Sequence, residues 1–409
     1  MNELTPDSRP LAGTVIVDLT SMLAGPFATM VLADLGADVI KIEPPRGDFI
    51  RDQGPYADDD DLHAYGGYFQ SVNRNKRSVV LDLKTEEGRA SLLSIVQGAD
   101  GLIENFRNGV MDSLGLSYER LREVNPRLVY GAIRGFGDSR TGASPMQDWP
   151  AYDVTVQALS GFMEITGEPG GPPTKAGPGI GDTVPALFAV IGFLAALHQA
   201  RREGSGSFVD VAMYDAMLAM SERTVYQHSY TGEIPSRVGN THPLLCPFDV
   251  APTSDGWVSI AAPPPVHWNR LCDTIGRPDL KDDERTKDNV HRLRNREIVR
   301  AAIEAWTSVH TKVEIMEMLG GKVPVAPVNN IEDIFHDPHV RARNMLVEVH
   351  HPGSAHPVTI ANSPIRFAGQ PGTAPRRAPL LGEHTHEVLA EFAAKSDQVP
   401  NEFMVTARD

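Results

Sequence analysis

Two strand–helix–strand units follow one another in the first 106 residues, and this repetition constrains the fold more than any other feature. In the first unit, the β-branched run of residues 14–20 leads into a helix-like segment that Pro26 can open and Gly36 can close. A second strand-like run, "DVIKIEPP", then ends in prolines. The second unit, residues 77–106, repeats this order. Units of this kind in series predict an α/β fold with a parallel sheet.

The second unit also carries a helix-start signal. Thr85 stands before the helix-like segment "TEEGRASLLSIVQG" and can cap its N-terminus. Glu86 and Glu87 then fall in the first turn, where the helix dipole favours negative charge. We therefore expect a helix that begins directly after Thr85.

The remaining pattern predicts more than one domain. A chain of 409 residues exceeds the usual size of a single domain. From about residue 225 the pattern changes to short strands with turns and charged helical stretches. We expect a large α/β domain to begin with residues 1–200, a smaller α+β domain over residues 225–325, and a C-terminal return over residues 335–409.

Composition excludes several classes of protein. A net charge of −15 without a basic block argues against a nucleic-acid partner. The longest apolar run, Ala186–Leu197, has 12 residues, whereas a membrane span needs roughly 20. The N-terminus has no apolar core of the signal-peptide kind. Two cysteines and fourteen histidines show no metal-ligand spacing, so no metal site is expected. We expect a cytoplasmic protein.

Three stretches could bind a ligand. The loop in "VDLTSMLAGPFA" opens a helix and offers N–H groups to a phosphate, although a purely structural turn would have the same pattern, and no G-x-G-x-x-G fingerprint is present. Three cations surround the strand in "NRNKRSVVLDLK" and could either hold a phosphorylated ligand or form a solvated face. "LIENFRNG" ends a strand where open α/β sheets bind ligands. The side chains concerned are Lys76, Arg77, Lys84, Asn105, Phe106 and Arg107.

The stretch "ITGEPGGPPTKAG" is either a surface connection or a catalytic loop. Its glycines allow the backbone to approach a ligand closely, and its prolines stiffen both ends. It holds one carboxylate, Glu168, and the acidic residues nearest to it in the chain include Asp153 and Asp182.

A series of motifs along most of the chain resembles the class III CoA-transferases, a family that includes formyl-CoA transferase, carnitine CoA-transferase and α-methylacyl-CoA racemase. The motifs are "DLTSMLAGPFATMVLADLGADVIKIEPP", "NRNKRSVVLDLKTEEG", "LIENFRNG", "GFGDSRTG", "ALSGFMEITGEPGGPPTKAG", "GNTHP" and "RAPLLGEHT". The resemblance implies a Rossmann-like large domain built from both chain ends, a smaller domain between them, and an interlocked homodimer. It also implies that coenzyme A is a substrate and not a tightly bound cofactor.

The resemblance also implies the residues that contact coenzyme A. The positions carried over are Leu23, Ala24, Leu81, Asp82, Leu83, Lys84, Asn105, Phe106 and Arg134. A coenzyme A-contacting arginine of the family falls on Ser113 here, and Arg107 is a candidate replacement. These positions agree with the crevice expected from the parallel sheet, and Lys76 and Arg77 are further candidate coenzyme A contacts because of their charge.

Transferases of this family use an aspartate as nucleophile, which forms a mixed anhydride and then an aspartyl-CoA thioester. Alignment on "GPPT" puts Gly170 at that position, and Glu168 is the nearest carboxylate. Glu168 is therefore the expected nucleophile, with the N–H groups of Gly170 and Gly171 as oxyanion donors. Asp182 and Asp153 would be supporting carboxylates.

The racemase branch of the family uses a histidine and an aspartate as two bases. Those positions fall on Tyr152 and Asp182 here, and a tyrosine with a reference pKa of about 10 is a poor base. Our leading interpretation is a CoA-transferase that moves CoA from an acyl-CoA to a small carboxylic acid. An acyl-CoA racemase or isomerase built on Asp182, and a non-catalytic acyl-CoA-binding protein, remain alternatives.

Overall fold

The computed structural model describes residues 9–369 and 375–396, and it divides into two compact units. The first unit takes the chain up to residue 161, residues 177–222 and the chain from residue 341. The second unit takes residues 162–176 and 223–340, so the glycine–proline loop groups with the middle of the chain and not with residues 1–200 as expected. The first eight residues, on which the absence of a signal-peptide pattern rests, lie outside the described residues, as do residues 370–374 and 397–409 of the expected C-terminal return.

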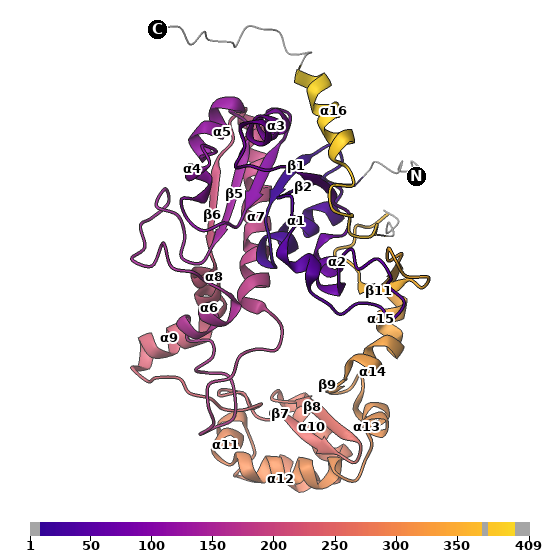
Figure 1. Ribbon diagram of the computed structural model, residues 1–409. Coiled ribbons are helices and arrows are strands. Elements are labelled where there is room, and N and C mark those ends of the chain that lie inside the picture. Colours follow the sequence, from indigo (N-terminus) through magenta and orange to yellow (C-terminus); the bar gives the residue numbers. More distant parts are fainter. Residues whose placement is uncertain (1–8, 370–374, 397–409) are drawn as a thin grey trace. The chain divides into compact units, whose positions relative to one another are not determined.

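A six-stranded parallel sheet forms the centre of the first unit (Figure 1). Its order is β3-β2-β1-β4-β5-β6, and each neighbouring pair of strands is parallel, which confirms the predicted α/β fold. The strands are β1 (Val15–Leu19), β2 (Asp38–Glu43), β3 (Arg77–Val80), β4 (Gly101–Glu104), β5 (Val129–Arg134) and β6 (Phe208–Ala212). The direction of winding reverses between β1 and β4, and ligands of doubly wound sheets bind at the carboxyl end of such a switch point.

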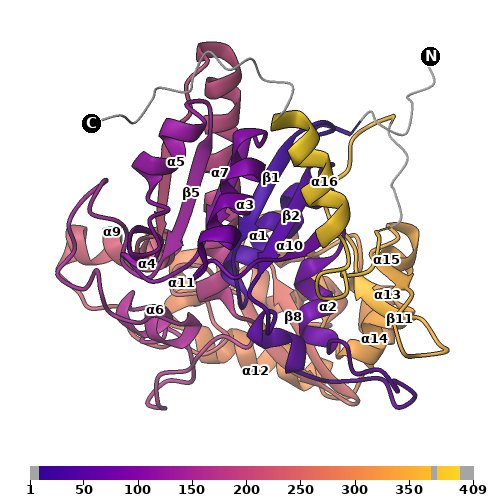
Figure 2. The same ribbon diagram turned by 45° about the horizontal axis from the view of Figure 1, so that its top comes forward.

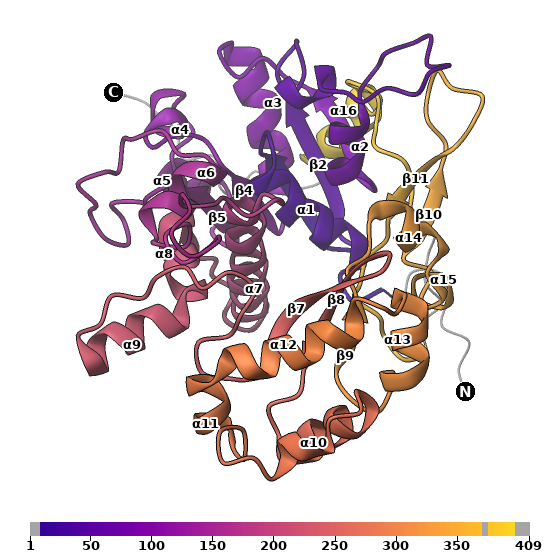
Figure 3. The same ribbon diagram turned by 90° about the horizontal axis from the view of Figure 1, so that it is seen from below.

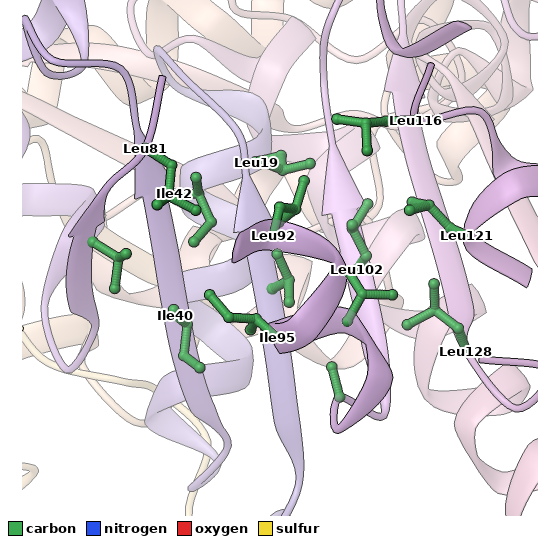
Figure 4. Close-up of a cluster of buried hydrophobic side chains, with 14 of the residues drawn as sticks. Leu19, Ile40, Ile42, Leu81, Leu92, Ile95, Leu102, Leu116, Leu121 and Leu128 are labelled. Atoms are coloured by element: carbon green, nitrogen blue, oxygen red, sulfur yellow. The ribbon is translucent and has the colours of Figure 1, made fainter. Parts of the chain in front are cut away.

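One face of this sheet is covered by α3 (Glu86–Gln97), α5 (Tyr118–Val124) and α16 (Thr385–Ser396). Leu92 and Ile95 of α3 lie over Leu19, Ile40 and Leu102 of the sheet (Figure 4). The hydroxyl of Thr85 accepts a hydrogen bond from the Gly88 N–H, so α3 begins at the predicted cap. Figure 2 shows α16 beside α3, which brings the end of the chain onto a sheet that the beginning of the chain builds.

The opposite face is covered by α1 (Ala24–Asp34) and α7 (Ile180–Glu203). The ring of Phe193 on α7 packs where Gly101 and Gly131 of adjacent strands leave room, since a β-carbon at Gly131 would lie 3.2 Å from its Cδ2. Among the described residues, α7 is the one helix long and apolar enough to cross a membrane. One side of α7 packs against α1, β5 and β6.

The other elements of the first unit are shorter. They are η1 (Phe49–Asp52), α2 (Gly67–Asn73), α4 (Val110–Ser113), α6 (Asp153–Leu159), α8 (Met213–Met220), β10 (Leu346–Val349) and β11 (Val358–Ala361). The last two strands form an antiparallel pair in the returning segment. Of these elements, α6 matters most for the site because it packs against the N-terminal turn of α7.

The second unit is an α+β arrangement around a small antiparallel sheet in the order β7-β8-β9 (Figure 3). Its strands are β7 (Phe248–Thr253), β8 (Gly256–Ala261) and β9 (Val325–Pro327). Its helices are α9 (Glu222–Thr231), α10 (Pro265–Thr274), η2 (Pro278–Lys281), α11 (Asn289–Arg294), α12 (Arg296–Thr307), α13 (Lys312–Leu319), α14 (Ile331–His336) and α15 (Pro338–Ala342), the first and last of which cross its borders. The buried Trp268, Leu271 and Ile260 lie in its core, as do both free cysteines.

Phe193→Ala should lower the free energy of unfolding by about 3–5 kcal/mol, because it empties the space over Gly101 and Gly131. Urea denaturation of the variant measures this change. His198→Ala, on the exposed side of the same helix, should stay within about 0.5 kcal/mol of the natural protein. Equal losses for both variants would contradict the packing described here.

Candidate active site

A cavity of about 270 Å³ opens in the first unit where the strands β1, β4 and β5 end. Three loops at the carboxyl end of the sheet form most of its wall, and α7 adds Asp182. The lining residues are Ser21, Met22, Leu23, Ala24, Asn105, Phe106, Arg107, Asn108, Ile133, Arg134, Gly135, Gln147, Trp149, Pro150, Ala151, Tyr152, Asp182 and Met213. Because β1 and β4 flank the switch point of the sheet, this is the position expected for a ligand.

Asn105 joins the first two loops. Its Oδ1 accepts a hydrogen bond of 2.9 Å from the Ser21 N–H, and its Nδ2 donates one of 2.8 Å to the Ser21 carbonyl oxygen. The next residue, Met22, has a φ of 67°, which is unfavourable for a side chain other than glycine. Asn105 therefore lines the cavity as predicted, but both polar ends of its amide are engaged within the protein.

Arg134 supports the loop that follows β4. Its guanidinium pairs with Glu104 and Asp138 and donates a hydrogen bond of 3.2 Å to Oδ1 of Asn108. Glu104 in turn accepts a 2.7 Å hydrogen bond from the Phe106 N–H, and burial raises the pKa of Glu104 although Arg134 opposes the shift. The charge of Arg134 is thus largely compensated, and its visible role is to shape the loop at Phe106–Asn108.

Asp182 and Asp153 meet at the start of α7. A β-carbon at Gly179 would lie 2.9 Å from Cδ2 of Leu23, 3.5 Å from Oδ2 of Asp182 and 3.9 Å from Cγ of Asp153. Asp153 accepts hydrogen bonds from the Gly181 N–H, at 2.8 Å, and from Gln157, at 2.6 Å. Asp153 therefore fastens α6 to α7, whereas Asp182 belongs to the cavity wall.

Tyr68 on α2 is a member of this neighbourhood that the sequence did not indicate. Burial raises the pKa of its phenol, and the negative charges of Asp182, Asp48 and Asp153 raise it further. The ring packs with Met22 and Leu23 against the apolar cluster around Phe69. In the sequence, an aromatic residue on a short helix looks like an ordinary core residue. Only the folded structure, which brings the three carboxylates near Tyr68, shows that it belongs to this neighbourhood.

Glu168 lies in the second unit, in an exposed turn. The Gly171 N–H donates to the Glu168 carbonyl oxygen at 3.0 Å, so Gly171 is not available as an oxyanion donor. A β-carbon at Gly239 would lie 3.1 Å from Oε2 of Glu168, and Gly239 and Gly170 have positive φ values of 64° and 74°. Gly170 of this turn therefore has a left-handed backbone conformation that favours glycine.

Lys76 and Arg77 are neither ligand contacts nor a solvated face, in contrast to both sequence interpretations. Lys76 is buried, and its Nζ lies 2.9 Å from Asp18, 2.8 Å from Asn73 and 3.0 Å from the Pro26 carbonyl oxygen. Arg77 pairs with Asp38, Glu387 and Glu391, which fastens α16 to β3.

The residues that follow β3 are not part of the cavity wall. Leu81 is buried in the core, Asp82 and Leu83 are half-buried, and Lys84 is exposed. Among the described residues, no group of three histidine, cysteine or acidic side chains has the geometry of a metal site. The wall of the cavity therefore consists mainly of the three loops and Asp182.

Comparison with known proteins gives the family. A sequence profile of CoA-transferase family III matches residues 11–385. The chain belongs to this family. It is 50% identical over 376 residues to the succinyl-CoA:mesaconate CoA-transferase of Haloarcula hispanica, covering 92% of this chain and 94% of that one. It is 39% identical over 404 residues to the succinate–glutarate CoA-transferase of Agrobacterium fabrum, covering 96% and 98%.

A solved structure agrees with this assignment. The crystal structure of a CaiB/BaiF family protein from Brucella suis superposes with a TM-score of 0.83 and 35% identity, over 94% of this chain and 99% of that one. The protein is a class III CoA-transferase, an enzyme that transfers CoA between carboxylic acids. This confirms the leading interpretation of the sequence.

Asn105→Ala should weaken coenzyme A binding by about tenfold, because it removes both hydrogen bonds that fix Ser21 in the cavity wall. Calorimetric titration with coenzyme A measures the change. The matched control is Asn125→Ala, which loses two hydrogen bonds to the carbonyl oxygens of Val96 and Ala99 and should lower stability without changing the Kd. An unchanged Kd for Asn105→Ala would refute this role.

Proposed function

We propose that the enzyme moves CoA from succinyl-CoA to a short dicarboxylic acid such as mesaconate. The relative from Haloarcula hispanica is named for these two substrates, and the relative from Agrobacterium fabrum for two saturated dicarboxylates. At 50% identity over 92% of the chain, the first relative is the better guide to the acceptor.

We propose Asp182 as the nucleophile in place of Glu168. The observation that supports it is its position in the wall of the switch-point cavity, beside Leu23, which the resemblance assigns to the coenzyme A site. Asp182 also lies in the first turn of α7, where the helix dipole favours a carboxylate and the negative charge that develops on a reacting carbonyl oxygen.

The proposed reaction has four balanced steps. The Asp182 carboxylate attacks the thioester carbonyl of succinyl-CoA, so the C–S bond breaks and leaves CoA thiolate and a mixed anhydride. The thiolate attacks the aspartyl carbonyl, which releases succinate and leaves an aspartyl-CoA thioester. The acceptor carboxylate displaces the thiolate to form a second anhydride, and the thiolate then attacks the acceptor acyl carbon. Asp182 is regenerated, and each step exchanges one activated acyl group for another without ATP.

The first two loops would hold coenzyme A. A cavity of about 270 Å³ is slightly smaller than the roughly 300–1,000 Å³ of typical ligand pockets, so it fits the thioester end of the molecule and not the whole nucleotide. Arg107 lines the cavity, is exposed and forms no ion pair among the described residues, so it is the cation best able to meet a phosphate or a substrate carboxylate. Lys84 is exposed at the end of β3 and remains a second candidate.

Asp182→Asn should abolish CoA exchange between succinyl-CoA and mesaconate, and Glu168→Gln should retain at least half of the natural rate. Incubation in D2O followed by mass spectrometry of the CoA pool measures both exchange and proton transfer. New thioesters without deuterium are expected from the natural protein. Loss of exchange in Glu168→Gln alone would return the nucleophile to the glycine–proline loop, and deuterium at the α-carbon without exchange would indicate a racemase.

We also propose that the enzyme is a cytoplasmic homodimer. The family resemblance implies a dimer, and Leu187, Phe188 and Ile191 of α7 are 46%, 43% and 64% exposed. Three large apolar side chains at helical spacing on one face of a helix are a typical protein contact surface.

Light scattering should give a mass of twice the 44.5 kDa of the chain. Ile191→Arg should shift the protein toward the single-chain mass on dilution, because a charge would enter the apolar contact. Gln199→Arg, at an exposed position of the same helix, serves as the control and should remain dimeric. A natural protein that runs at 44.5 kDa would contradict the dimer.

A further inference from the structure

Behind the first loop of the cavity lies a buried ion pair that the proposed chemistry does not use. Lys41 of β2 and Asp48, which precedes η1, are 3.0 Å apart between Nζ and Oδ2, and their side chains are 0% and 1% exposed. A charge removed from water in this way is costly unless its hydrogen bonds are satisfied, so the bonds that each partner makes are informative.

Both partners reach the main chain of the cavity loop. Lys41 donates to the Thr20 carbonyl oxygen at 2.8 Å, and Asp48 accepts from the Met22 N–H at 3.3 Å through Oδ1. Asn105 binds both polar groups of the residue between them, Ser21. The two charged side chains therefore bind the main chain on either side of Ser21, and one of the residues bound is Met22, whose φ is 67°.

Other contacts keep the ion pair itself in place. Asp48 accepts from the Ile50 N–H at 3.3 Å, and its own N–H donates to Glu43 at 3.0 Å. Asp18 binds the Thr20 N–H at 2.8 Å and lies near Lys41. A strained backbone conformation persists only where its surroundings determine it, and this network supplies such surroundings for Met22.

We propose that Lys41 and Asp48 are positioning residues for the transferase reaction: they hold Thr20–Met22 in the conformation that receives the thioester end of coenzyme A. Both side chains are buried, and neither belongs to the cavity wall. The inference rests on the proposed location of the coenzyme A site, and it assigns a function in binding geometry to a pair whose burial alone would suggest only stability.

The decisive variant is Lys41→Met combined with Asp48→Leu. Replacing a buried ion pair by apolar side chains of similar volume often leaves stability unchanged, whereas the hydrogen bonds to Thr20 and Met22 are lost. We expect a melting temperature close to that of the natural protein, a Kd for coenzyme A at least tenfold weaker by calorimetry, and a fall in kcat/KM for succinyl-CoA that is at least as large. A stable double variant with an unchanged Kd would overturn the proposal.

Asp48→Asn provides a second test that should disturb the fold less. An amide has one acceptor oxygen, so either Lys41 or the N–H groups of Met22 and Ile50 must lose a partner. The Kd should again weaken, by about threefold or more, and an unchanged value would count against the proposal even if the double variant does not fold.

The matched control is Arg74→Met combined with Asp34→Leu. Arg74 and Asp34 are also a buried pair, 2.7 Å apart. Asp34 is the last residue of α1, about 15 Å along the helix from the cavity loop that precedes α1. This variant should bind coenzyme A normally. An equal increase of the Kd in both double variants would mean that loss of stability, and not the position of the loop, causes the effect. Asp182→Asn separates this proposal from the proposed nucleophile. Loss of CoA exchange in that variant tests Asp182, whereas its Kd for coenzyme A shows whether the loop still binds the ligand.

Discussion

The cavity at the carboxyl end of the sheet depends on one hydrogen-bonded junction, in which the amide of Asn105 binds both main-chain polar groups of Ser21. The two residues follow β1 and β4, the neighbouring strands from which the chain winds in opposite directions. The cavity lies where these loops leave the sheet in opposite directions, and the hydrogen bonds of Asn105 join the two loops at their bases. The ionic groups beneath them, Asp18, Lys41 and Asp48 on one side and Glu104 and Arg134 on the other, fix each loop to its own strand.

Local patterns were sufficient to predict the sheet and the place of the cavity. The β-branched run at residues 14–20, Pro26 and the cap at Thr85 act over a few residues, and short-range signals of this kind are visible in the sequence. Asn105 and Phe106 were expected in the crevice because all parallel strands end at the same edge of the sheet. The parallel direction of the strands was enough to place these two residues, and their side-chain contacts did not have to be known.

Partners distant in the chain explain what the sequence could not predict. Lys76 and Arg77 are cations in a row, and their role depends on Asp18 and Asp38, which only the folded sheet brings to them. The same limit applies to the carboxylates. Alignment on a short glycine–proline motif pointed to Glu168, whereas the place of Asp182 in the cavity wall follows from how α7 packs on the sheet and from the hydrogen bond that the Gly181 N–H donates to Asp153.

The two glycines under Phe193 also bear on the chemistry. Phe193 and Asp182 are 11 residues apart on α7, which is about three helical turns, so both point to nearly the same side of the helix. The ring seated between Gly101 and Gly131 and the carboxylate in the cavity wall therefore belong to the same side of one helix. A β-carbon at Gly101 would lie 2.3 Å from Cζ of Phe193, so a side chain there would displace the helix that carries Asp182. Substitution of a glycine in the middle of the sheet would thus be felt by a carboxylate of the cavity wall, about 16 Å away along the helix.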